Sequence, residues 1–219
     1  MRVYYIRHGM TTANETTGIC GRRIDWPLSE NGRRELRELA AKGIYPEDHG
    51  SCYTSTLRRT QETLRIIYPN TDFEPTHLLD ERDLGDIEYV TDVEVARAWR
   101  ENMVDEHGNE RPETYRGGEN FEQFSQRVHR DMNALLEMAF SRGQETITIC
   151  GHGSYLRQIG ISFAVESYIN VRPIVKNGRG FLFQAARNAP YDFCLKIEGF
   201  VGGSDMNEVL MCPVAASRR

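Results

Sequence analysis

Two histidine–glycine pairs, each placed just after an apolar run, have the residue types and spacing for chemistry. His8-Gly9 follows residues 3–6 and Arg7, and His152-Gly153 follows residues 147–151. Ligands bind outside the carboxyl ends of the strands in an α/β sheet, so two positions 144 residues apart (152 minus 8) can meet in one pocket. That pocket would hold two imidazoles.

Two further segments supply positive charge and an acid. Residues 55–59 read Ser-Thr-Leu-Arg-Arg, and residues 79–82 read Leu-Asp-Glu-Arg. In phosphoryl transfer, a nucleophile attacks phosphorus while fixed positive groups stabilise the charge on the equatorial oxygens. Two histidines, several arginines and a carboxylic acid are the groups that this chemistry needs.

Strand and helix patterns alternate along the chain and would position these residues. Strands are expected at 3–6, 51–54 and 146–150, and helices at 29–43, 56–67, 119–142 and from residue 154, with a helix opening at the polar stretch 11–14. Residues 181–183 and 193–197 indicate late strands, antiparallel at an edge. The order predicts a three-layer α/β/α sandwich with a mostly parallel central sheet.

The length of 219 residues suits one domain with a sizeable core. We expect this domain at 1–203, with an inserted cap at about 86–118, because that stretch is rich in charge and contains Trp99, Pro112 and Gly117-Gly118. Such insertions usually shape substrate access. Residues 204–219 are expected to form a flexible tail.

Charge and cysteine usage bound the partners and the compartment. The formal net charge of −5 argues against a nucleic-acid-binding surface, and no apolar run has the length of a membrane span. No secretory signal precedes the first strand, and the cysteines are odd in number and scattered, which favours a reducing cytoplasm. A monomer or a homodimer fits this surface. The cysteines are Cys20, Cys52, Cys150, Cys194 and Cys212.

These segments, in this order, resemble the histidine phosphatase superfamily, also called the phosphoglycerate mutase-like family, over roughly the first 160 residues. Gly118-Glu119 is similar to the family's Gly-Glu before its long helix, a match that supports the fold more than the chemistry. The family's functional positions fall on Arg7-His8-Gly9, Asn14, Arg59 within residues 55–59, Glu81 and His152-Gly153.

The resemblance implies a phosphatase that hydrolyses a small phosphorylated metabolite, with His8 attacking the phosphomonoester and carrying the phosphoryl group as phosphohistidine. Arg7, Arg59 and His152 would bind the phosphoryl oxygens, and Asn14 and the Gly153 N–H would add donors. Glu81 would protonate the leaving oxygen and later accept a proton from water. The scheme requires neither a metal ion nor a cofactor.

Two other functions remain open from the sequence. A phosphoglycerate mutase would transfer the phosphoryl group within phosphoglycerate, but the stretch after Glu81 lacks the arginine-rich segment that we associate with such mutases. A phosphate-ligand sensor on an inactive fold is suggested by two features. Met10 stands where many members have Glu or Gln, and the candidate acid Glu81 lies in a segment crowded with other acidic residues.

Each candidate residue could also have a purely structural or solvent-exposed role. His8 and His152 could be satisfied histidines at strand ends, Arg59 a solvated helix charge, and Glu81 part of a solvated acidic loop. The other histidines have no such motif residues beside them and are interpreted as surface or structural. They are His49, His77, His107 and His129. Cys20 and Cys150 lie in no Cys-x5-Arg loop, so neither is favoured as a nucleophile, and Cys150 is expected to pack in its strand.

Overall fold

The computed structural model describes residues 1–103, 111, 117–163, 165 and 175–203. Within them, six strands form one sheet in the order β3-β2-β4-β1-β5-β6. The strands β3, β2, β4 and β1 run parallel, whereas β5 pairs antiparallel with both β1 and β6. The predicted mostly parallel sheet with antiparallel late strands at one edge is therefore confirmed. The strands are β1 (Arg2–Arg7), β2 (Ser51–Thr54), β3 (Phe73–Pro75), β4 (Thr146–Gly151), β5 (Gly180–Ala189) and β6 (Asp192–Val201).

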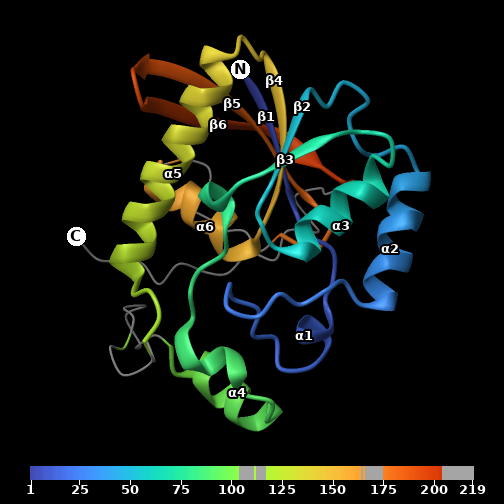
Figure 1. Ribbon diagram of the computed structural model, residues 1–219, viewed down its shortest axis with the longest axis vertical. Helices are drawn as coiled ribbons and strands as arrows, with labels where there is room; N and C mark the ends of the chain where they lie inside the picture. The colour runs from blue at the N-terminus through green and yellow to red at the C-terminus, as the bar shows by residue number, and fades with distance from the viewer. Residues whose placement is uncertain (104–110, 112–116, 164, 166–174, 204–219) are drawn as a thin grey trace.

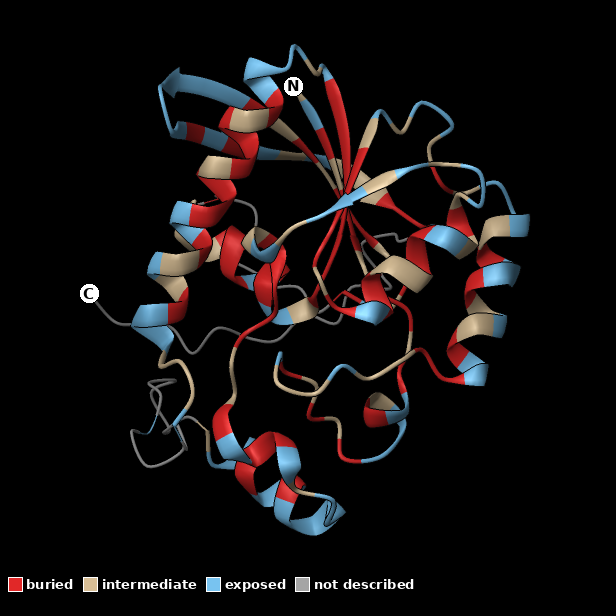
Figure 2. Cartoon of the chain, in the orientation of Figure 1, coloured by how far each residue is buried: buried red, intermediate tan, exposed pale blue. Residues whose placement is uncertain are grey.

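Helices cover both faces of the sheet. In Figure 1, α2 (Glu30–Ala41) and α3 (Arg58–Ile67) lie on one side of it, and α5 (Phe121–Ser141) and α6 (Gly153–Ser162) lie on the other. Side chains alternate along β1, so Val3 and Tyr5 join the core beneath α5 and α6 while Ile6 joins the core beneath α2. Figure 2 shows the central strands β2, β4 and β1 mostly buried between these layers, whereas β3 and the outer part of β5 and β6 are more exposed. The three-layer sandwich is confirmed.

The register of the two central strands brings the histidine motifs to one edge. Arg7 at the end of β1 pairs with Gly151 at the end of β4, and the His8 N–H donates to the Gly151 carbonyl at 2.9 Å. His8 and His152 therefore leave neighbouring parallel strands at the same position. A four-residue helix, α1 (Thr12–Glu15), follows His8, and α6 follows His152 directly.

The helix boundaries follow local capping. Ser29 caps α2 by accepting from the Gly32 N–H, and Asn120 and Gln123 form a capping box at the start of α5. The predicted helices at 29–43 and 119–142 are accordingly confirmed within a few residues. The helix predicted from residue 56 begins instead at Arg58, after the extended residue Leu57.

Part of the predicted cap is described. A 3-10 turn, η2 (Gly85–Tyr89), leads into α4 (Val93–Glu101), which lies away from the sheet in Figure 1. Its buried residues Ala96 and Trp99 pack with Ile19 and Ile87 in a small cluster separate from the cores on the sheet. Whether this segment governs substrate access stays a prediction. The predicted tail at 204–219 lies outside the described residues.

Candidate active site

The structure brings the two histidines together. Both side chains are buried, and their ring centroids lie 5.3 Å apart with an interplanar angle of 63°. Tyr5 fixes the second histidine's backbone, because its hydroxyl accepts from the His152 N–H at 2.9 Å and donates to the His152 carbonyl at 3.2 Å. The pair therefore stands on the rigid ends of β1 and β4.

The protonation of His8 follows from its hydrogen bond. Its Nδ1 lies 2.7 Å from the Gly9 carbonyl oxygen, and because a carbonyl can only accept, Nδ1 must carry the proton. Nε2 then keeps its lone pair. Burial, and after it the charges of Arg59 and Arg7, hold the pKa of His8 well below its usual range. His8 is thus a neutral imidazole with a nucleophilic Nε2 at pH 7.

His152 has the opposite tautomer. Its Nδ1 accepts from the Arg59 Nε at 3.3 Å, because a guanidinium can only donate, so its proton resides on Nε2. Nε2 donates to the Ser55 hydroxyl at 2.8 Å. Ser55 in turn donates to the Thr60 hydroxyl at 2.9 Å, and Thr60 donates to the Leu57 carbonyl at 2.8 Å. This directed chain orients the ring, and through it the Arg59 guanidinium.

The two arginines present N–H groups without partners. Arg7 donates from Nη1 to the Val175 carbonyl at 2.6 Å, and Arg59 donates from Nη2 to the Gly21 carbonyl at 2.9 Å. In the described structure, Arg7 Nε and Arg59 Nη1 are buried and have no hydrogen-bond partner. A buried donor left unpaired costs about 1–3 kcal/mol. Donors of this kind are the groups that a bound anion satisfies.

Glu81 is the buried acid of the site. Its carboxylate accepts from the Arg82 N–H at 2.9 Å and from the Ser154 N–H, at the start of α6, at 3.1 Å. Burial raises the pKa of Glu81 above its usual range, although these N–H donors and the charge of Arg59 oppose the shift. Nearby Glu88 instead accepts from backbone N–H groups, including that of Leu84 at 2.9 Å. The acidic segment is therefore not uniformly solvated.

Asn14 faces the same site from α1. Its amide oxygen accepts from the Thr11 N–H at 3.2 Å and from the Asn177 Nδ2 at 3.5 Å, which leaves its NH₂ group to donate elsewhere. Asn177 also donates to the His8 carbonyl at 2.9 Å. It therefore connects the segment before β5 to both residues.

A cavity of about 230 Å³ is lined by most of the residues predicted to form the site. Arg59 and His152 are buried and are not among its lining residues, but the His152 ring packs edge-on against the His8 ring that lines it. A larger and more open hollow of about 470 Å³, at residues 117–130, contains neither histidine. The cavity is lined by Arg7, His8, Asn14, Gly18, Cys20, Glu81, Leu84, Gly153, Ser154, Leu156, Arg157 and Val175.

The structure also shows the surroundings of the cysteines and of the residue types that could bind a metal ion. Burial raises the pKa of the Cys20 thiol although it lines the cavity, so it is not an activated thiolate. Cys150 packs against Cys52 and Leu64, as predicted. Among the described residues, no three His, Cys, Asp or Glu side chains form a group that could hold a metal ion.

Several residues that support the site were not predicted from the sequence. Ser55 stood inside a recognised motif but had no role assigned, and its contact with His152 depends on how β2 pairs with β4. Asn177 carries no local signal, because only the fold brings it to His8.

The chain also matches a family of known proteins. The model of the histidine phosphatase superfamily (branch 1) matches residues 3–167. A protein of Schizosaccharomyces pombe named a probable phosphatase is 33% identical over 111 residues, which cover 49% of this chain and 52% of that protein, so the chain spans about half of its length. A 2,3-bisphosphoglycerate-dependent phosphoglycerate mutase of Parvibaculum lavamentivorans is 30% identical over 163 residues, covering 70% of this chain and 75% of the mutase.

The solved structures agree with the fold. Bacillus stearothermophilus YhfR superposes with a TM-score of 0.67 at 24% identity, covering 90% of this chain and 96% of YhfR.

Within the described residues, no helix has both the length and the apolar character needed to span a bilayer.

Proposed function

The chain belongs to the histidine phosphatase superfamily, and we propose that it is a metal-independent phosphatase that hydrolyses a small phosphomonoester through a phosphohistidine on His8. One observation carries this proposal. A neutral imidazole with a free Nε2 lies in a buried site whose arginines, Arg7 and Arg59, each have an N–H without a partner. A nucleophile beside unsatisfied cationic donors is the arrangement that phosphoryl transfer needs.

In the first half-reaction, Nε2 of His8 attacks phosphorus and the bond from phosphorus to the leaving oxygen breaks. Protonated Glu81 gives its proton to that oxygen, so the product leaves as an alcohol. Arg7 and Arg59 stabilise the charge that develops on the phosphoryl oxygens, and the Asn14 NH₂ adds a donor. The proton of His8 stays on Nδ1, which donates to the Gly9 carbonyl, so the phosphorylated ring carries a positive charge that balances the phosphoryl group.

In the second half-reaction, water attacks phosphorus and the phosphorus–nitrogen bond to His8 breaks. The Glu81 carboxylate accepts a proton from this water, which restores the protonated acid, and inorganic phosphate leaves. His8 returns to its neutral state. His152 orients Arg59 through both steps, while Ser55 and Thr60 hold the tautomer that it needs for this.

The test is phosphate release in the presence of a chelator. The wild type would be incubated with a panel of phosphorylated metabolites and p-nitrophenyl phosphate, beside His8→Ala and, as control, His129→Ala, an exposed histidine on α5. We expect release that His8→Ala abolishes and the control retains, together with an acid-labile phosphoryl label on the wild type. Full activity in His8→Ala would refute the proposal.

A phosphoglycerate mutase is the second candidate, because several relatives, among them the Parvibaculum lavamentivorans protein, bear that name. Labelled bisphosphoglycerate separates the two, since a mutase returns the label to phosphoglycerate and a phosphatase releases it as inorganic phosphate. Phosphate binding without turnover of any substrate would instead indicate a sensor. A cytoplasmic setting, and a monomer or homodimer without nucleic-acid or membrane partners, remain predictions.

A further inference from the structure

The guanidinium of Arg127, on α5, lies against the backbone that carries Glu81. Its Nη1 donates to the Asp80 carbonyl at 3.0 Å, and its Nη2 donates to the Glu81 carbonyl at 3.0 Å. Arg127 has no part in the reaction scheme above. Two charge-assisted hydrogen bonds to adjacent carbonyls nevertheless fix the peptide from which the acid projects.

Arg127 is itself held by Glu119. Its Nε donates to Glu119 Oε1 at 2.5 Å and its Nη2 to Oε2 at 2.9 Å, in the bidentate arrangement that fixes both partners. Their side chains are only 12% and 16% exposed. Burial alone would raise the pKa of Glu119, but the bonds from Arg127 and the Asp83 N–H lower it below its usual range, so the pair stays ionised.

Glu119, which precedes α5, also holds Arg82 and Asp83, the two residues after Glu81. Glu119 accepts from the Asp83 N–H and donates its own N–H to the Asp83 carbonyl, both at 2.8 Å. Arg82 donates twice to the Glu119 carbonyl, at 3.0 and 2.7 Å. A Cβ on Gly118 would lie 2.3 Å from the Asp83 oxygen and 2.5 Å from the Gly85 nitrogen, so a glycine is needed for this close approach.

We propose that Arg127 and Glu119 form a positioning pair for the general acid. The inference rests on the proposed role of Glu81 as that acid. Arg127 fixes Glu81 at its carbonyl, while the Ser154 N–H holds the carboxylate at the other end. A general acid must come within about 2.6–3.2 Å of the leaving oxygen, and a misplacement of about 1 Å can cost about 100-fold in rate.

Leaving-group dependence tests the pair. p-Nitrophenolate leaves readily without protonation, whereas phenolate needs the acid, so misplacing Glu81 must slow phenyl phosphate more than p-nitrophenyl phosphate. Arg127→Lys keeps the positive charge but loses the two-pronged guanidinium, and Glu119→Gln loses the carboxylate. For both variants we expect kcat/KM on phenyl phosphate, which reports the step in which the leaving group departs, to fall about tenfold more than kcat/KM on p-nitrophenyl phosphate. A role confined to stability would lower both rates equally.

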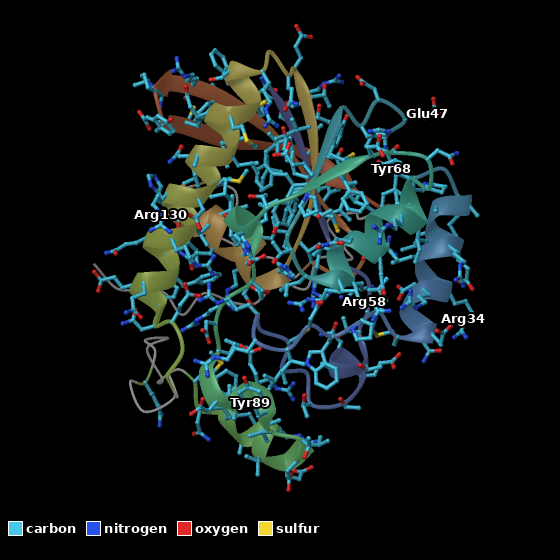
Figure 3. All side chains as sticks on the ribbon, viewed as in Figure 1. Arg34, Glu47, Arg58, Tyr68, Tyr89 and Arg130 are labelled. Atoms are coloured by element: carbon cyan, nitrogen blue, oxygen red, sulfur yellow. The ribbon has the colours of Figure 1, made fainter. Side chains whose placement is uncertain are left out.

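Two controls sharpen the test. Arg130→Lys changes an arginine on the same helix whose side chain is 71% exposed and pairs with Asp131, and it should leave both rates unchanged. Figure 3 shows Arg130 on the outer side of α5. In a Glu81→Gln background, Arg127→Lys should add no leaving-group selectivity, because the acid is already gone.

The outcomes separate this inference from the proposed function. Equal losses on the two substrates in Arg127→Lys and Glu119→Gln, at unchanged thermal midpoint, would overturn the positioning pair and leave the phosphatase intact. Selective loss that persists in the Glu81→Gln background would also overturn it. Absence of His8-dependent hydrolysis in the wild type would refute the phosphatase itself. If either variant is destabilised, the ratio of the two rates is still measured on its folded fraction, since unfolding lowers both equally.

Discussion

At the scale of residues, the site uses hydrogen bonds to give two neighbouring imidazoles different tasks. The Gly9 carbonyl places the proton of His8 on Nδ1, whereas Arg59 forces the proton of His152 onto Nε2. One ring is left with a free lone pair, and the other is engaged at both nitrogens. The expectation that His152 binds phosphoryl oxygens stays a prediction, and in this structure the ring serves to orient Arg59.

Arg59 and its neighbour Arg58 should differ sharply. Arg59 is fully buried against His152, whereas the Arg58 side chain is 60% exposed and pairs with Glu62 at 2.6 Å. We expect Arg59→Ala to lower kcat/KM on p-nitrophenyl phosphate by about 100-fold or more, because a fixed donor to the developing charge is lost. Arg58→Ala should change it less than threefold. Steady-state kinetics of the two variants would decide, and similar losses would mean that Arg59 does not face the phosphoryl group.

The pH dependence of activity should report Glu81. Burial raises its pKa, and the protonated form is the acid, so kcat/KM on phenyl phosphate should fall as pH rises through that raised pKa. The pKa of His8 is lowered, so its protonation should limit the rate only well below pH 6.5. In Glu81→Gln the alkaline fall should disappear. An alkaline limb that survives in this variant would assign the titration to another group.

At the scale of elements, α2 supports the loop after the nucleophile through a glycine. A Cβ on Gly32 would lie 2.1 Å from the Met10 carbonyl oxygen, which belongs to that loop. Alanine normally favours a helix over glycine by about 1 kcal/mol, but here the clash with backbone should dominate. We expect Gly32→Ala to lower both the thermal midpoint and the activity, whereas Glu38→Ala, at an exposed position of α2, should change neither. Stabilisation by Gly32→Ala would show that the loop can move away.

The elements that the sequence predicted are those with long or strong patterns. β1, β4 and α5 were foreseen because buried runs and helical spacing extend through them. β3 has only three residues and ends in Pro75, too short for a period and unlike a strand in composition. The helix α4 lay within a charged stretch interpreted as a cap or loop, although Asp92 caps its first turn by accepting from the Glu94 and Val95 N–H groups.

For the site, too, the sequence predicts what a local pattern carries and not what distant packing brings together. Adjacent motif residues such as Arg7 and His8 could be named from the chain, because their neighbours on the strand fix where they lie. The partners of Glu81 could not, since Arg127 and Ser154 reach it only through the packing of α5 and α6. Sequence thus identifies the groups that react, and only the fold identifies the groups that hold them.

At the scale of the whole molecule, two buried neutral imidazoles make stability depend on pH. The pKa of both His8 and His152 is lowered on folding, first by burial and then by Arg59. Below about pH 6.5 the unfolded chain binds protons at these positions and the folded chain does not, so this contribution to stability is lost as pH falls. Glu81 acts in the opposite direction, because its raised pKa makes the folded state the better proton binder.

Urea unfolding at pH 7.5 and pH 5.5 isolates the histidine contribution. Between these two pH values each imidazole should remove about 1 kcal/mol of unfolding free energy. A His8→Gln variant should therefore lose about 1 kcal/mol less than the wild type, and because Glu81 is present in both proteins, its opposing contribution largely cancels. An equal acid loss in His8→Gln and the wild type would mean that His8 takes up its proton in the folded protein near pH 6.5, which would contradict a nucleophile held neutral by its site.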